Sequence, residues 1–119
     1  MSLSRLLEKP LSRKQVDTKV ALVVEEILKL CKPSKIVLFG SGAAGTAKPS
    51  SDLDFAIIFV NQAEVREAKQ VYKISALLGI PIDFLLFDEA GYKEKLDRGG
   101  VCELIEAEGR VVFPIVEPG

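Results

Sequence analysis

The chain has 119 residues, of which 48% are hydrophobic and 28% are charged, with 16 Lys and Arg against 17 Asp and Glu. This length and composition predict one globular domain over residues 1–119. A nearly neutral chain has no bulk attraction to nucleic acid, and no apolar run reaches the ~20 residues that span a bilayer. Residues 1–10 lack the apolar stretch and cleavage site of a secretory signal. We therefore expect neither nucleic acid nor membrane as a partner.

The chain has two cysteines, Cys31 and Cys102, and no histidine. Two distant cysteines without a secretory signal predict reduced, partly buried thiols in a cytoplasmic protein. The lack of histidine excludes Ser-His-Asp and Cys-His nucleophilic systems and the usual histidine-containing zinc sites. Acid–base or metal chemistry must therefore use carboxylates, hydroxyls or lysines.

Apolar periodicity and turn residues predict alternating helices and strands. Ser12 and Gln15 have the spacing of a capping box, Gly79 suits a helix C-cap, and Asp88 suits an N-cap. The expected helices span 14–31, 61–78, 89–97 and 101–107, with room for a short one at 42–49. The expected strands span 35–40, 53–60, 80–87 and 110–113.

This order predicts a single α/β (α+β) layer domain with a mixed sheet of about four strands and helices packed on it. The helix at 61–78 forms a crossover, which makes the strands at 53–60 and 80–87 parallel. Both strands then start at the same end of the sheet. If the strand at 35–40 runs antiparallel to the second strand, its end meets the same edge.

The first strand ends in Gly40-Ser41-Gly42. Glycines let a backbone turn tightly and approach a ligand, while turn amides and the Ser41 hydroxyl can donate to phosphate. Taken alone, such a tripeptide is more often a plain turn.

Asp52 and Asp54 stand two residues apart at the start of the second strand, a spacing that puts both carboxylates on one face. Their repulsion is strong at a low-dielectric edge, and a divalent cation such as Mg²⁺ relieves it. The alternative is a turn signal at Asp52 and a solvated strand end at Asp54.

Asp83 is a single acid in an otherwise apolar strand, on the face of Leu85 and Phe87 that would normally be core. An unpaired buried carboxylate is costly, so we expect a partner, which is either a lysine or the same metal site. The expected topology favours the metal site, because it brings the glycine turn and the three acids to one edge. Such a set suits phosphoryl or nucleotidyl transfer with two metal ions.

Gly40-Ser41, ten intervening residues, Asp52-Leu53-Asp54 and a later strand-borne Asp83 resemble the nucleotidyltransferase superfamily related to DNA polymerase β. The small size is similar to its minimal nucleotidyltransferase (MNT) branch. The resemblance covers roughly residue 14 to Phe113, which implies a domain core at about 14–113, and the segment 108–113 looks like the end of that family's domain.

The resemblance implies a polymerase-β-like fold and a role for each motif residue. Gly40 and Ser41 would hold the triphosphate of ATP, the expected substrate. Asp52 and Asp54 would bind two Mg²⁺ ions, and Asp83 would bind one of them and help activate the attacking hydroxyl. NMP, most often AMP, would then pass to a hydroxyl while pyrophosphate leaves.

The chain departs from the family at one position: Ala44 stands where members often carry an arginine in the pattern GSxARG. Lys48 is either a substitute cation or a solvated loop lysine. The resemblance also implies a partner protein of the HEPN class that presents the hydroxyl, as in toxin–antitoxin pairs. Three hypotheses remain open: a transferase acting on such a partner, a weak or inactive nucleotide-binding antitoxin that masks it, and a structural domain with solvated acids. The oligomeric state, including a homo-oligomer, is open too.

Overall fold

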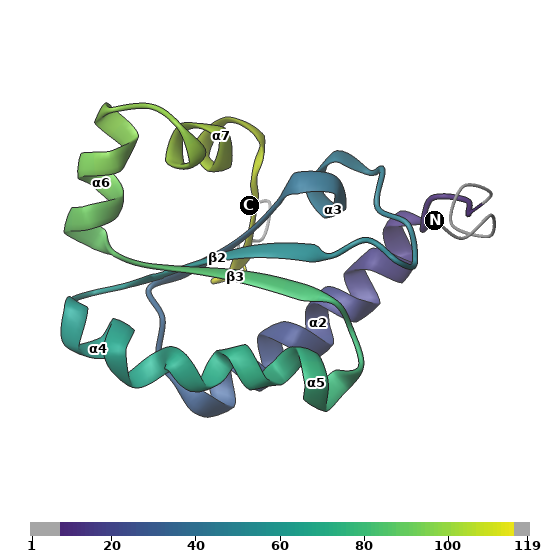
Figure 1. Cartoon of the computed structure of the whole chain (residues 1–119), viewed down its shortest axis with the longest axis horizontal. Coiled ribbons are helices and arrows are strands. Elements are labelled where there is room, and N and C mark those ends of the chain that lie inside the picture. Colours follow the sequence, from purple (N-terminus) through teal and green to yellow (C-terminus); the bar gives the residue numbers. More distant parts are fainter. Residues whose placement is uncertain (1–7, 116–119) are drawn as a thin grey trace.

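The computed structural model describes residues 8–115, in which four strands form one sheet with helices on both faces (Figure 1). The strands are β1 (Lys35–Phe39), β2 (Leu53–Phe59), β3 (Ile82–Asp88) and β4 (Arg110–Phe113). The helices are α2 (Arg13–Leu30), α3 (Gly40–Ala44), α4 (Gln62–Glu67), the 3₁₀ helix η1 (Ala68–Lys73), α5 (Ile74–Leu78), α6 (Glu89–Asp97) and α7 (Val101–Glu108). Residues 1–7 and 116–119, and the expectations that concern them, lie outside the described residues.

The predicted α+β class and mixed sheet are confirmed. The strand order is β3-β2-β1-β4; β1 runs antiparallel to β2 and β4, whereas β2 and β3 are parallel. Parallel pairing follows from the crossover between β2 and β3, because the chain must return to the same end of the sheet before it starts the next strand.

Local capping explains where the helices begin and end. Ser12 Oγ accepts from the Gln15 amide at 3.1 Å, and Gln15 Oε1 accepts from the Ser12 amide at 2.8 Å, so the predicted capping box is formed. Asp88 caps α6 by accepting from the Gly91 amide at 3.0 Å. Gly79 ends α5 in the left-handed conformation, with φ of 66°.

The continuous helix expected over 61–78 is wrong, because the structure divides it into α4, η1 and α5. The division follows the spacing of its buried residues. They recur every three residues, at Val65, Ala68, Val71 and Ile74. A 3₁₀ helix has 3.0 residues per turn and keeps such a row on one face, whereas an α-helix with 3.6 would rotate it away from the sheet.

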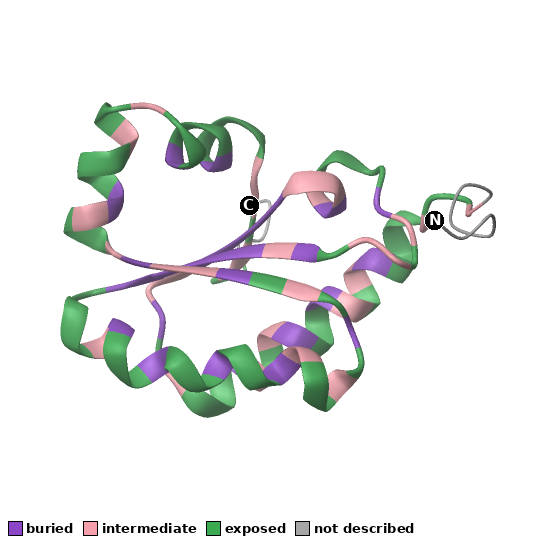
Figure 2. Cartoon of the chain, viewed as in Figure 1, coloured by how far each residue is buried: buried purple, intermediate pink, exposed green. Residues whose placement is uncertain are grey.

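The central strand β2 separates two apolar layers. Its alternate residues Phe55 and Ile57 pack toward α2, α4, η1 and α5, while Ala56 and Ile58 pack toward α6 and α7. Figure 2 shows the buried positions gathered on the strands and on the helix faces turned to them. The continuous apolar run of β2 is therefore explained by helices on both faces, as its sequence predicted.

Among residues 8–115, no helix combines the length and the hydrophobicity required to cross a bilayer.

Candidate active site

The three predicted acids lie at one edge of the sheet, where β1 ends and β2 and β3 begin. Asp54 is the register partner of Phe39 in β1 and of Asp83 in β3. Asp52 directly precedes β2. Since adjacent strands lie ~4.8 Å apart, the Asp54 and Asp83 backbones are direct neighbours. The edge expected from the topology is therefore formed.

Asp54 is half-buried, whereas Asp52 and Asp83 are exposed. The expectation that Asp83 needs a partner because of burial is thus wrong. Asp83 shares a strand face with Leu85 and Phe87, which pack with α6 and α7, but it stands at the start of the strand, away from these helices (Figure 1). Water solvates a carboxylate there, so no lysine is required.

The electrostatics of the edge centre on Asp54. Burial raises the pKa of its carboxyl above the usual range, and the negative charges of Asp83 and then Asp52 raise it further. Within residues 8–115, none of the three acids forms an ion pair with a lysine or arginine. Their mutual repulsion is therefore not relieved by a cationic side chain of the described protein.

Gly40 begins α3 next to Asp54 and has a φ of 69°. A Cβ at this position would overlap with Asp54 Oδ2. Two separate features thus favour glycine at position 40: the left-handed backbone, and the space that the Asp54 carboxylate occupies. The sequence suggested a phosphate role for Gly40, but its contact with Asp54 was not foreseen, because it depends on the pairing of β1 with β2.

The other residues of the turn have separate surroundings. Ser41 is half-buried, Gly42 is buried against Leu38 and Leu53, and Ala44 is exposed. Lys48 is half-buried, and its backbone amide donates to Ser51 Oγ at 3.0 Å in the loop before Asp52. The structure assigns no ion pair to Lys48 within the described residues, so its role as a substitute cation stays a prediction.

The donor chemistry of the edge suits a hard divalent cation. Carboxylate oxygens are the ligands that Mg²⁺ takes from proteins, together with water and phosphate oxygens. Across residues 8–115, however, no three His, Cys, Asp or Glu side chains stand close enough to hold one ion as they are. Asp52, Asp54 and Asp83 would have to rotate about their side-chain bonds to share a metal, and their assignment as ligands stays a prediction.

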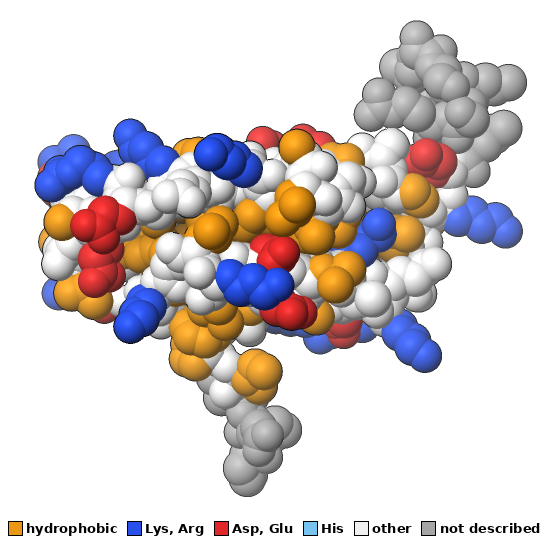
Figure 3. Space-filling model, turned by 90° about the horizontal axis from the view of Figure 1, so that it is seen from below, with side chains coloured by type: hydrophobic (Ala, Val, Ile, Leu, Met, Phe, Trp, Pro, Cys, Tyr) orange, Lys and Arg blue, Asp and Glu red, His pale blue; other side chains and the backbone are white. Residues whose placement is uncertain are grey.

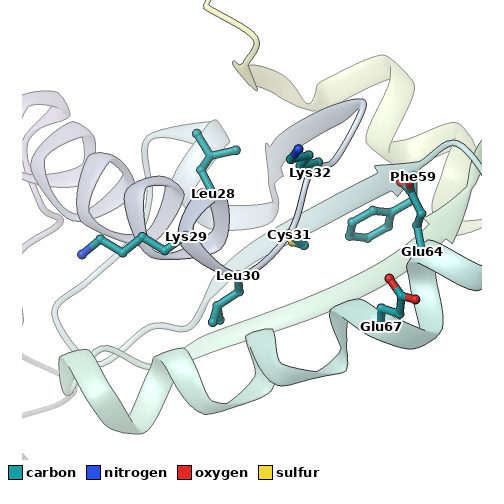
Figure 4. Close-up of a pocket in the computed structure, with 8 residues that line it drawn as sticks. All are labelled: Leu28, Lys29, Leu30, Cys31, Lys32, Phe59, Glu64 and Glu67. Carbon is teal, nitrogen blue, oxygen red and sulfur yellow. The ribbon is translucent and has the colours of Figure 1, made fainter.

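A separate hollow lies at the C-terminal end of α2, and Figure 4 shows the residues that line it. It includes Cys31, Phe59, Glu64 and Glu67 but none of the predicted site residues. The Cys31 thiol donates to Ile27 O at 3.4 Å, and burial raises its pKa. Both cysteines are free thiols, as the sequence predicted.

Comparison with known proteins gives this edge its context. The nucleotidyltransferase domain family matches residues 8–112, which include the turn and all three acids. The chain belongs to this family. A search of curated proteins found no match.

Two crystal structures share the nucleotidyltransferase fold of this chain. One is a protein from Sulfolobus solfataricus assigned as a nucleotidyltransferase, with 24% identity, a TM-score of 0.51 and coverage of 87% of each chain. The other is a toxin-antitoxin with AMP-PNP, with 21% identity, a TM-score of 0.50 and coverage of 76% of this chain and 70% of that one. At such identities the likeness shows the fold alone.

We expect Gly40→Ala to destabilise the protein more than Gly79→Ala and to displace the Asp54 carboxylate. Both glycines have similar positive φ, 69° and 66°, so both substitutions incur a backbone cost of roughly 1 kcal/mol or more. A Cβ at Gly79 meets no atom within 4 Å, whereas one at Gly40 overlaps with Asp54. Urea denaturation and the Asp54 side-chain carboxyl NMR shift measure the two effects. Equal destabilisation with an unmoved Asp54 signal would show that the close approach is unimportant.

We expect Asp54→Asn to increase the free energy of unfolding at pH 7 in metal-free buffer. The raised pKa means that ionised Asp54 costs stability in the folded protein. This cost is present above the folded-state pKa and disappears below the unfolded value of about 3.9. The gain should therefore shrink as the pH falls from 7 toward 4.

Urea denaturation across this pH range, with EDTA present, measures the gain. Asp97→Asn, at an exposed position in α6, is the matched control and should change stability by less than about 0.5 kcal/mol. A gain for Asp54→Asn that stays constant over the pH range would contradict the electrostatic explanation.

Proposed function

We propose that this nucleotidyltransferase domain transfers NMP, most favourably AMP from ATP, to a hydroxyl on a partner protein. The observation that carries the proposal is the register of Asp54 with Asp83 at the edge where β1 ends in Gly40. Two carboxylates and a tight glycine turn at one edge support this chemistry, because a triphosphate with its metal ions would need both kinds of contact. Family membership supports the same chemistry.

Each residue of the edge has a proposed part in the reaction. Gly40 and Ser41 hold the triphosphate through the turn backbone and the Ser41 hydroxyl. Asp52, Asp54 and Asp83 would hold two Mg²⁺ ions, and these ions would neutralise phosphate charge and lower the pKa of the acceptor hydroxyl. Asp83 is exposed and therefore open to the acceptor.

The transfer itself is an in-line displacement. A bond forms between the acceptor oxygen and the α-phosphorus, and the bond from that phosphorus to the oxygen bridging it to the β-phosphate breaks. Pyrophosphate leaves with the bonding electrons. The hydroxyl proton passes to Asp83 or to water.

A partner protein, and with it an antitoxin role, is supported by the similarity to a toxin-antitoxin structure and by the surface of the chain. The HEPN class of this acceptor is proposed from the family resemblance of the sequence. Large apolar side chains are exposed on α2, η1 and α5, among them Leu22, Leu30, Tyr72 and Leu77. Figure 3 shows hydrophobic side chains on this face, interspersed with charged side chains of both signs. Exposed apolar surface of this kind is typical of protein contacts.

The proposal places the domain core at residues 14–113, because the elements from α2 to β4 fill this range. It places the protein in the cytoplasm, where thiols such as those of Cys31 and Cys102 stay reduced.

We expect the Asp52→Asn/Asp54→Asn double variant to lose AMP transfer by at least about 100-fold, since a major electrostatic contribution to the transition state is removed. Purified protein is incubated with α-labelled ATP and Mg²⁺, with and without candidate HEPN proteins, and label on protein is counted. Asp97→Asn serves as the control and should transfer normally. Full transfer by the double variant would refute the assignment of these acids.

A second candidate function is an antitoxin that masks its partner with weak or absent catalysis. Two observations favour it: Ala44 replaces the arginine common in the family, and the three acids do not form a closed metal cluster as they stand. In this case the exposed apolar surface of α2 and α5 would bind the partner protein and mask it.

Calorimetry with ATP and Mg²⁺ separates the two functions. For the transferase, we expect metal-dependent ATP binding that Asp54→Asn weakens by at least about tenfold, since Asp54 is the half-buried acid at the centre of the edge. Absence of metal-dependent binding in the unaltered protein would favour the masking function instead.

A further inference from the structure

A hollow of about 340 Å³ lies between the start of α2, helix α3 and the start of β4. The segment from Gly42 to Gly45 forms part of its wall, and Arg13 and Arg110 also line it. This volume falls in the range of small-molecule sites. The hollow is distinct from the carboxylate edge, because none of the three acids lines it.

The two arginines share one carboxylate, that of Asp17. Arg110 Nη2 donates to Asp17 Oδ1 at 2.8 Å, and Arg13 Nε donates to Asp17 Oδ2 at 3.3 Å. A guanidinium has five N–H donors, and in the part of the chain that the structure describes each arginine uses one of its nitrogens in these bonds. Most of their donors are thus available, and one positive charge is left over.

The lining of this hollow does not supply a second negative charge, although Glu25 lines a neighbouring hollow with Asp17 and Arg110. Asp17 is the one acidic side chain among the residues of the hollow and its ion pairs, and the first turn of α2 has no acidic residue. Arg110 is also held in place: its side chain is 30% exposed, and the ion pair ties the start of β4 to α2. A partly buried guanidinium with open donors matches the geometry of a phosphate group.

The hollow lies near the carboxylate edge but on the opposite face of the sheet. Arg110 pairs with Leu38 on one side of β1, and Asp54 pairs with Phe39 on the other. Arg110 reaches toward α2, whereas Asp54 shares its strand face with Ala56, which packs toward α6 and α7. This segment therefore approaches the Asp54 carboxylate at Gly40 and lines the hollow from Gly42 to Gly45.

We propose that this hollow binds the phosphate group of a small molecule through Arg13 and Arg110, behind the glycine turn. The anion neutralises the charge that Asp17 leaves uncompensated. The site does not depend on the proposed transfer reaction, because it shares no carboxylate with the candidate active site. It would place a cationic phosphate contact beside Ala44, where the turn has no cation of its own.

The test is an NMR titration of ¹⁵N-labelled full chain, without Mg²⁺ and at constant ionic strength, with inorganic phosphate, pyrophosphate and ATP in separate arms. We expect shifts of the Ala43, Ala44 and Gly45 amides and of the Arg13 and Arg110 side-chain Nε signals. Tighter binding of ATP than of inorganic phosphate would assign the phosphate to a nucleotide; comparable binding would assign it to a free or smaller phosphate. No saturable shift at these positions in any arm would overturn the proposal.

Charge variants separate binding from a structural role of the ion pairs. Arg110→Gln should weaken phosphate binding about tenfold, and Arg13→Gln, at a 73% exposed side chain, should weaken it while leaving the fold intact. Asp17→Asn should strengthen binding, since it releases both guanidiniums. A purely structural bridge predicts no gain for Asp17→Asn, and that result would also overturn the proposal.

Two controls complete the design. Arg98→Gln removes an exposed arginine that pairs with Glu94 in α6 and should leave phosphate binding unchanged. Asp97→Asn removes an exposed acid of α6 that does not line the hollow, and it should also leave phosphate binding unchanged. AMP transfer is measured separately on the unaltered protein, so absent transfer with retained phosphate binding distinguishes failure of the proposed function from failure of this inference.

Discussion

Pairing of β2 with strands on both sides fixes the position of Asp54: Asp83 is its neighbour in β3, and Phe39, the residue before Gly40, is its neighbour in β1. Backbone hydrogen bonds hold these neighbours, so the two carboxylates cannot separate by more than side-chain rotation allows. Repulsion between them is therefore stored in the folded protein. The rigid sheet keeps ligands at a set spacing, at a cost that a bound cation would offset.

The helices on the Asp54 face leave the starts of β2 and β3 open. Helix α6 packs near the opposite end, where Tyr92 makes an edge-to-face contact with Phe87 at 5.4 Å between ring centroids, and α7 lies between α6 and α3 (Figure 1). The Tyr92 hydroxyl donates to Glu106 Oε2 at 2.9 Å and joins the two helices. Burial raises the Tyr92 pKa, which keeps this donor protonated. These helices thus leave Asp52 and Asp83, at the strand starts, exposed to solvent.

Much of the fold could be predicted from sequence because its signals are local. The capping box at Ser12, the C-cap at Gly79 and the apolar run of β2 each depend on neighbouring residues, and each is confirmed. The crossover was predicted as one α-helix because Ala68, Val71, Ser75 and Leu78 recur at the three- and four-residue spacing of an α-helix face. The sequence also carries a signal for the 3₁₀ segment, because the apolar residues Val65, Ala68, Val71 and Ile74 are three positions apart. Counting these spacings would have predicted the 3₁₀ helix.

The candidate site was predictable only in part, because its details come from contacts across the sheet. The spacing of Asp52 and Asp54 and the crossover sufficed to expect Asp83 at the same edge. The exposure of Asp83 depends on where α6 and α7 end, and the clash at Gly40 depends on strand register. Arg13 and Arg110 meet at Asp17 from opposite ends of the chain, so no local pattern relates them.

The 3₁₀ segment η1 also affects the length of the crossover between β2 and β3. A 3₁₀ helix rises ~2.0 Å per residue against ~1.5 Å in an α-helix, so its six residues extend the crossover by about 3 Å. This is close to the rise of one strand residue, ~3.3 Å. An all-α crossover of the same number of residues would return less far and would begin β3 about one residue later along β2. The winding of a helix that contains none of the acids thereby decides which residue of β3 stands beside Asp54.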